Sequence, residues 1–320
     1  MAQVKSQAKA EKPAPAKKVR VANGWLSVCS GCEISLLDMD EALLGVLEKV
    51  EFVHSPVLMD IKYNEIPDDI DVCILTGCIR NKENMELAKE YRKKSKLVVA
   101  LGACACFGGV PGLGNLVTNQ EIYDTVYFQT PSTINGTNIV PDPDVLTLTD
   151  RVYALPEVVK VDYALPGCPT PSNVIVAALT ALLEGKEPQL PTLTVCDDCP
   201  RKRTEGFTIP RVKRWAYNHD MDPEKCILEQ GYLCMGSVTR TGCDATCPSG
   251  GVPCRGCWGP SPNIEDAGAK MMSNLGSLTD VDGGMSPGEL VEALADPVSL
   301  LYRYNLALAP INKTIRGDGK

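Results

Sequence analysis

The stretch LVVALGACACFGG, residues 97–109, joins a nearly continuous apolar run to a turn rich in glycine and cysteine. Such runs are typical of parallel strands that helices cover on both faces. Comparable runs occur at residues 19–23, 50–55, 72–77 and 158–165. Helical patterns lie between them, at residues 32–49, 81–95 and 172–185. This alternation predicts an α/β protein built on a doubly wound parallel sheet.

The composition excludes several classes of protein. With 320 residues, 44% of them hydrophobic, the chain is long enough to bury a sizeable core. A formal net charge of -8 argues against nucleic acid as a partner, because such binding depends on clustered Lys and Arg. No apolar run reaches the roughly eighteen residues that a membrane-spanning helix needs, so we expect no membrane association.

The cysteines are too numerous to be incidental. Residues 1–17 contain Lys, Ala and Pro but neither an apolar core nor a twin-arginine pair, so we expect a flexible tail and a cytoplasmic protein. Thiols stay reduced in that compartment and stable disulfides are rare. The fifteen cysteines therefore indicate metal ligation or redox chemistry.

The strand and helix pattern divides the chain. We expect residues 18–191 to form the α/β domain. Residues 192–320 are rich in turns, Cys, Gly and Pro, and predict a second, mostly irregular domain. Because its apolar core looks thin, we expect bound metal to help it fold.

One group of cysteines follows the predicted strands. Cys29 and Cys32 come after the first strand, Cys104 after the fourth and Cys168 after the fifth. In an open α/β sheet the carboxyl ends of the strands converge on one crevice, so these four thiols can meet. Gly and Pro beside them allow the close backbone approach that cluster sulfurs need. Cys73, within a strand, is predicted to be a buried apolar residue.

Eight further cysteines lie in the second region. Proximity in sequence favours two sets, one of Cys196, Cys199, Cys226 and Cys234, the other of Cys243, Cys247, Cys254 and Cys257. Exchanges between these sets are compatible with the sequence, and the roles of Cys78 and Cys106 stay open. Structural zinc is the alternative occupant, but zinc ribbons usually pair two CxxC knuckles across a longer spacer. Three quartets in one chain instead favour iron-sulfur clusters acting as an electron conductor.

Taken in order, CxxC after the first strand, GACACFGG, PGCPTP, CxxCP and CPSGGVPCRGCWGP resemble the small subunit of [NiFe] hydrogenases. The resemblance runs from about residue 18 to about residue 260. It implies a flavodoxin-like first domain whose Cys29, Cys32, Cys104 and Cys168 bind a proximal cluster beside the nickel-iron site of a separate large subunit. The later cysteines would bind a medial and a distal cluster.

Two departures from the pattern of exported family members narrow the resemblance to one subgroup. Many exported members have a His at the distal site and three medial cysteines, whereas Cys196 stands at the position of that His and Cys243 supplies a fourth medial thiolate. Three [4Fe-4S] clusters are therefore expected. With the cytoplasmic expectation, this resembles the methyl-viologen-reducing, non-deazaflavin-reducing hydrogenases of methanogens, and implies a ferredoxin-like [2Fe-2S] subunit and heterodisulfide reductase as partners.

Two alternatives remain beside this hypothesis. The cluster subunit of complex I-like quinone oxidoreductases shares the flavodoxin-like domain, but it has adjacent cysteines in place of CxxC and lacks the cysteine-rich tail. A structural zinc protein would explain the number of cysteines, but not thiols at three strand ends.

Overall fold

The computed structural model describes residues 17–137, 139–141, 145–209, 211–213, 220–279 and 286–315. The tail expected at residues 1–17 lies outside this part, apart from Lys17. No helix in the described ranges has both the length and the apolar character needed to cross a bilayer.

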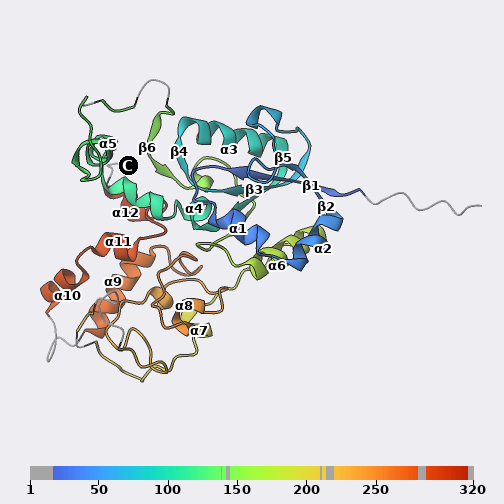
Figure 1. Cartoon of the computed structure of the whole chain (residues 1–320). Helices are drawn as coiled ribbons and strands as arrows, with labels where there is room; N and C mark the ends of the chain where they lie inside the picture. Colours follow the sequence, from blue (N-terminus) through green and yellow to red (C-terminus); the bar gives the residue numbers. More distant parts are fainter. Residues whose placement is uncertain are drawn as a thin grey trace, which may run out of the picture.

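A five-stranded parallel sheet forms the centre of the α/β part, with the strand order β2-β1-β3-β5-β7 (Figure 1). Its strands are β1 Val19–Trp25, β2 Val50–His54, β3 Ile70–Thr76, β5 Ser95–Leu101 and β7 Tyr163–Leu165. Numbered within the sheet, this is the order 2-1-3-4-5 of flavodoxin-like folds. A second sheet pairs β4 (Ile79–Asn81) antiparallel with β6 (Leu148–Tyr153). The predicted doubly wound, flavodoxin-like fold is confirmed.

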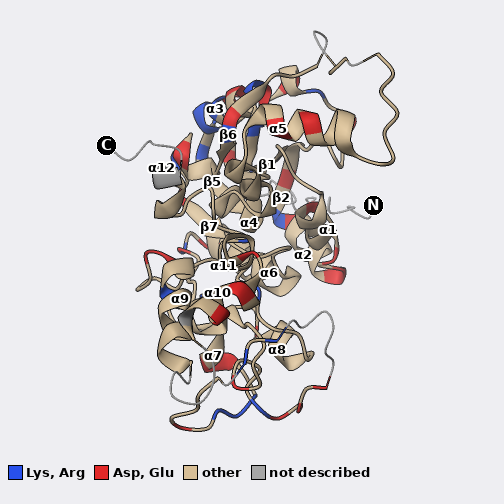
Figure 2. Ribbon diagram, turned by 90° about the vertical axis from the view of Figure 1, so that its left-hand side faces the viewer, with Lys and Arg blue, Asp and Glu red and all other residues tan. Residues whose placement is uncertain are grey.

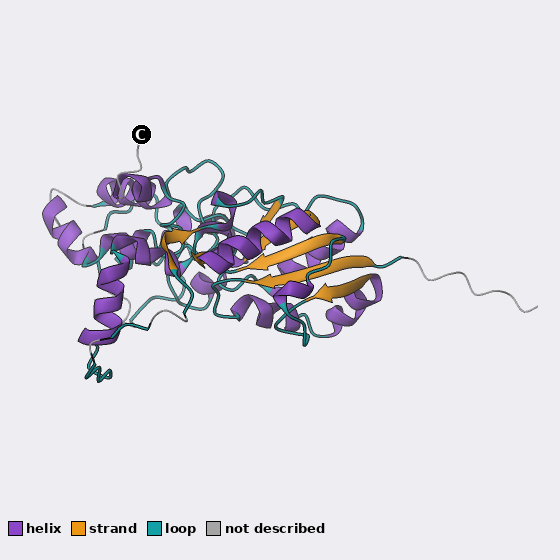
Figure 3. Ribbon diagram, turned by 90° about the horizontal axis from the view of Figure 1, so that it is seen from above, coloured by secondary structure: helices purple, strands orange, loops and turns teal. Residues whose placement is uncertain are grey.

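Helices cover both faces of this sheet, as Figure 3 shows from above. Along β3, Cys73 and Leu75 belong to one buried cluster, whereas Val72 and Ile74 belong to another on the opposite face. The first cluster includes Tyr91 of α3. The covering helices are α3 Lys82–Lys94 on the first face, and α1 Gly31–Leu37, α2 Glu41–Lys49 and α6 Ser172–Leu183 on the second. Burial of alternate side chains on opposite faces explains why the strands lack a polar face.

Two predicted segments differ from the structure. Residues 32–49 are not one helix, because the chain turns between α1 and α2, where Asp40 has φ 49° and Met39 points into the core. Of residues 158–165, only the last three form a strand. The backbone N–H groups of Val158 and Val159 instead donate to the Leu155 carbonyl, at 3.0 and 3.1 Å, and close a helical turn.

A glycine lies just beyond the end of α6. Gly185 has φ +71°, and its N–H donates to the Leu182 carbonyl at 3.0 Å. The N–H of Lys186 donates to the Ala181 carbonyl at 2.8 Å. This pair of hydrogen bonds is a Schellman motif, which favours glycine at the left-handed position.

The cysteine-rich part has more helix and a larger core than expected. Ala267, Met271 and Leu275 follow each other at intervals of four residues along α9 and are 4%, 0% and 1% exposed. They pack in one cluster with Leu301 and Leu306. The expectation of a thin core is therefore wrong, because residues 267–278 have a helical spacing of apolar side chains. The remaining helices are α4 Gly102–Phe107, α5 Asn119–Asp124, α7 Val195–Asp198, α8 Thr246–Ser249, α9 Ala267–Leu278, α10 Pro287–Leu294, α11 Pro297–Leu301 and α12 Pro310–Ile315.

Alanine substitutions at two glycines test this packing, and we expect them to change the stability of the fold in opposite directions. A Cβ on Gly24 of β1 would lie 2.4 Å from Leu75 and 2.6 Å from Tyr91, whereas one on Gly45 of α2 would meet nothing within 4 Å. Gly24→Ala should destabilise the fold by about 1–3 kcal/mol through overpacking. Gly45→Ala should stabilise it by up to about 1 kcal/mol, because alanine favours the helix. Thermal unfolding midpoints of the two variants check this, and a Gly24→Ala midpoint at or above that of the wild type would contradict the packing.

Candidate metal centres

The four cysteines predicted to meet at the sheet lie at its carboxyl edge. Cys29 follows β1, and Cys32 occupies the first turn of α1. Cys104 lies in α4, which begins directly after β5, and Cys168 follows β7. β1, β3, β5 and β7 are consecutive in the sheet, so three separate loops bring these residues to one edge. We call these four residues the first group.

The thiols of the first group lie close enough to affect one another. The pKa of Cys32 is raised to about 12, mainly by burial and with contributions from the Glu33 carboxylate, Cys168 and Cys29. Burial also raises the pKa of Cys104, with contributions from Cys78, Cys168, Cys32 and Cys29. All four members therefore share one electrostatic environment, in which a bound cation is needed to stabilise the thiolates.

Glycines leave room for these sulfurs. Gly102 has φ +88°, and a Cβ there would lie 2.3 Å from the Cys32 Sγ. Gly109 has φ +58°, and a Cβ there would lie 2.5 Å from the Cys104 Sγ. Only glycine combines this backbone conformation with the close approach. The expectation that glycine beside the thiols serves close packing is confirmed at both positions.

Three cysteines of the α/β part lie outside the first group. Cys73 is fully buried, as predicted, and burial raises its pKa to about 12. Cys78 and Cys106 are also buried, and their Sγ atoms each lie 3.5 Å from a backbone carbonyl, those of Ser27 and Ala100. These contacts suit neutral thiols that donate to the backbone.

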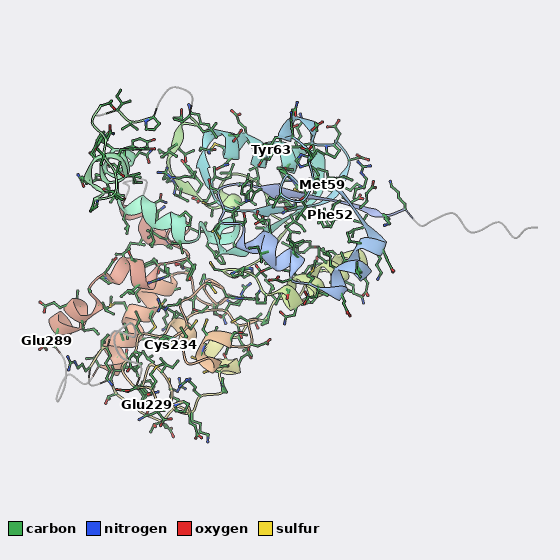
Figure 4. The ribbon with its side chains drawn as sticks, in the orientation of Figure 1. Phe52, Met59, Tyr63, Glu229, Cys234 and Glu289 are labelled. Atoms are coloured by element: carbon green, nitrogen blue, oxygen red, sulfur yellow. The ribbon has the colours of Figure 1, made fainter. Side chains whose placement is uncertain are left out.

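A second group comprises Cys196, Cys199, Cys226 and Cys234. The pKa of Cys196 is raised to about 12, mainly by burial and with contributions from the other three members. A Cβ on Gly236 would lie 3.3 Å from the Cys196 Sγ and 3.7 Å from the Cys234 Sγ, so a glycine again separates two thiols. Figure 4 marks Cys234 within the cysteine-rich part, away from the sheet. These four thiols are therefore close enough to interact electrostatically.

A third group comprises Cys243, Cys247, Cys254 and Cys257. The pKa of Cys257 is raised to about 12, mainly by burial and with contributions from the thiols of Cys243 and Cys247. Burial raises the pKa of Cys254 well above its usual value, with Cys234 of the second group and Cys257 contributing. Cys254 therefore lies between the second and third groups.

Close approaches connect the three groups in series. The backbone of Cys168, in the first group, is near enough to the Cys257 thiol of the third group to lower its pKa. The backbone N–H of Cys254, in the third group, donates to the Cys234 Sγ of the second group at 3.3 Å. The third group thus contacts both of the others.

Several features indicate what these groups can hold. Among the described residues, no three His, Cys, Asp or Glu side chains are close enough to bind a single metal ion. The donor atoms are thiol sulfurs, which suit iron-sulfur clusters and zinc, and glycines keep the space around them open. The Nε atoms of Arg240 and Arg303 are buried with no hydrogen-bond partner, as expected near an anionic group.

Sequence inspection missed three side chains beside these groups. Glu33, next to Cys32, is 2% exposed and accepts a hydrogen bond from the Thr76 hydroxyl. Its position directly after a CxxC motif was a usable signal. Arg201 donates from Nε to the Pro248 carbonyl at 2.8 Å and so ties the loops of the second and third groups together. Arg240 carried no recognisable signal, because its burial depends on the tertiary fold. Figure 2 shows basic and acidic segments interspersed along the loops near α7 and α8.

Comparisons with known proteins cover most of the chain. Residues 29–182 match the family model described as NADH ubiquinone oxidoreductase, 20 Kd subunit. A subunit of the F420-non-reducing hydrogenase of Methanothermobacter marburgensis is 42% identical over 308 residues, which cover 95% of this chain and 100% of the relative. The iron-sulfur subunit of the F420-non-reducing hydrogenase of Archaeoglobus profundus is 37% identical over 309 residues, which cover 90% of this chain and 96% of the relative. A chain of an NAD+-reducing [NiFe]-hydrogenase, solved in the H2-reduced state, is 36% identical with a TM-score of 0.51 over 55% of this chain and 96% of that chain.

The glycine beside Cys32 gives a test of the first group. Gly102→Ala should lower the metal bound per chain by about a third, because the new methyl group would occupy the position of the Cys32 Sγ while the other two groups stay intact. Metal analysis of purified protein measures this, with Gly45→Ala as a control that should bind as much as the wild type. Full metal content in Gly102→Ala would show that the first group does not need this space.

The pKa of Cys73 gives a pH-dependent test of burial. The thiol is neutral in the folded chain up to about pH 12, but ionises near pH 9 once unfolded. Its contribution to stability is therefore complete below pH 9 and lost as the pH rises toward 12. The cost of Cys73→Ala, measured by urea unfolding, should be about 2 kcal/mol smaller at pH 10.5 than at pH 8. An equal cost at both values would indicate that the thiol is accessible to water.

Proposed function

Because this chain belongs to the [NiFe] hydrogenase small-subunit family, and is thus an electron-transfer subunit of a hydrogenase, we propose that it conducts electrons through three [4Fe-4S] clusters. The observation that carries this proposal is the serial contact of the three cysteine groups. The Cys168 backbone lies near enough to the Cys257 thiol to lower its pKa, and the Cys254 N–H donates to the Cys234 Sγ at 3.3 Å. The first group is therefore proximal, the third medial and the second distal.

The chain's own residues prepare these sites. The proposed ligands are Cys29, Cys32, Cys104 and Cys168 for the proximal cluster, Cys243, Cys247, Cys254 and Cys257 for the medial cluster, and Cys196, Cys199, Cys226 and Cys234 for the distal cluster. When bound, such clusters store and pass single electrons. The glycines at 102, 109 and 236 let the backbone come close to the sulfurs. No side chain of this chain needs to act as an acid or base in the proposal.

Trp258 restricts water beside the medial ligands. It directly follows Cys257, is 2% exposed and lies so close to Gly242 that a Cβ there would come within 2.4 Å of the indole ring. Burying an aromatic ring next to a ligand lowers the local dielectric constant, and this influences the potential of a bound cluster. We propose this supporting role for Trp258.

The two alternatives, a complex I-like cluster subunit and a structural zinc protein, receive less support. The family model named after the ubiquinone oxidoreductase subunit ends at residue 182, before the second and third groups begin. The Methanothermobacter relative matches over 95% of this chain, a span that must include most of the eight later cysteines. The Archaeoglobus relative is named as an iron-sulfur subunit, which favours clusters over structural zinc.

The proposal also assigns partner subunits, the surfaces that they would bind and a cellular location. A nickel-iron large subunit would bind at the carboxyl edge of the sheet, beside the first group, since relatives of this chain are subunits of [NiFe] hydrogenases. A ferredoxin-like [2Fe-2S] subunit would accept electrons at the second group and pass them to heterodisulfide reductase, in the cytoplasm. We further propose that the α/β domain ends near residue 191 and that the medial and distal clusters belong to the domain after it.

Replacement of a proximal ligand tests this function. Cys168→Ala should reduce hydrogen-driven dye reduction by the assembled hydrogenase to a few per cent or less, because electrons leave the large subunit at this site. Cys73→Ala, which removes a buried thiol outside the three groups, is the matched control and should keep most of the activity. Unchanged turnover in a Cys168→Ala complex with its full iron content would refute the ligand role.

A further inference from the structure

Arg240 lies where the cysteine-rich part meets the sheet domain. Its backbone N–H donates to the Gly259 carbonyl at 3.0 Å, and Thr194 pairs with it in an isolated β-bridge. Gly259 in turn packs against Phe107 of α4, where a Cβ would lie 2.3 Å from the ring. The same helix carries Cys104, and Cys243 follows Arg240 by three residues. Arg240 is thus placed between the proximal and medial groups.

The Arg240 side chain forms no ion pair within the described part of the chain. Its Nε is buried without a hydrogen bond. An arginine keeps its charge in proteins, so it cannot avoid the cost of burial by losing a proton. Arg240 is only partly buried, but holding its Nε away from water without a partner is still unfavourable. Such a residue is expected where an anion accompanies it in the functional protein.

The neighbouring thiol of Cys106 does not serve as that anion. Its Sγ donates to the Ala100 carbonyl at 3.5 Å, as a neutral thiol does, and the Arg240 cation lies within electrostatic reach of it. Cys106 is also within electrostatic reach of Cys32 and Cys104, which places the cation near the proximal ligands. An iron-sulfur cluster held by four thiolates carries a net negative charge, and each electron that it accepts adds one more.

We propose that the Arg240 guanidinium is a partly buried counter-cation between the proximal and medial groups that makes one-electron reduction there easier. This inference rests on the proposed function. Reduction adds one negative charge without a proton, so a fixed cation stabilises the reduced form more than the oxidised form. The effect falls with distance, so the distal group should respond least. Arg240 acts on potential only and is not a ligand.

The test is an anaerobic redox titration of the hydrogenase followed by EPR spectroscopy, with iron and sulfide measured on the same samples. In Arg240→Gln and Arg240→Met, the midpoint potential of the proximal or medial cluster should become more negative, because the cation is lost. Arg240→Lys, which keeps the charge, should stay closer to the wild type. Lys202→Gln is the control, because that side chain is 85% exposed and its charge is screened by solvent.

Each result decides between distinct conclusions. Unchanged proximal and medial potentials in a neutral variant with full iron content would overturn the role of Arg240 and leave the proposed function intact. Loss of iron in both neutral variants but not in Arg240→Lys would support a counter-cation, whereas loss in all three would show that the shape of arginine matters rather than its charge. Absence of cluster signals and sulfide in the wild type would refute the proposed function itself.

Discussion

The whole arrangement depends on the convergence of parallel strands. The strands β1, β5 and β7 end at one edge of the sheet, and the loops after them carry Cys29, Cys104 and Cys168. An antiparallel sheet would send alternate loops to opposite edges and separate these thiols. Because both faces of the sheet are covered by helices, the strands are held firmly and the edge is a stable platform. The cysteine-rich part then continues from this edge of the sheet, because its third group lies beside the first group.

The second constraint is space around sulfur. Gly102, Gly109 and Gly236 lie where any side chain would press on a thiol, and the first two also have left-handed backbone conformations. Burial keeps many of these thiols neutral until a metal binds, so a cationic iron centre must displace their protons. Helices α9 to α11 contribute a separate apolar core, which supports the loops of the second and third groups. Apolar packing and metal binding therefore both stabilise the cysteine-rich part.

Much of the fold could be predicted, because local signals and the tertiary structure agree. The apolar run at 97–102 indicated a covered parallel strand, and its position before Cys104 indicated the edge where the thiols meet. The family resemblance, confirmed by relatives along nearly the whole chain, placed it among hydrogenase subunits. The break between the two helices at Asp40 was not predicted, because the apolar residues around it keep a helical spacing. In the structure the chain turns there and Met39 points into the core. The role of Arg240 could not be predicted, since nothing in the local sequence shows that its Nε is buried without a hydrogen bond.

The central claim is that three groups of thiols hold iron-sulfur clusters in series. The most direct measurement is the content of iron, acid-labile sulfide and zinc in the anaerobically purified chain. The account predicts about twelve iron and about twelve sulfide per chain with negligible zinc. One to three zinc ions without sulfide would contradict it, because zinc cannot carry electrons and the conducting role would then have no physical basis.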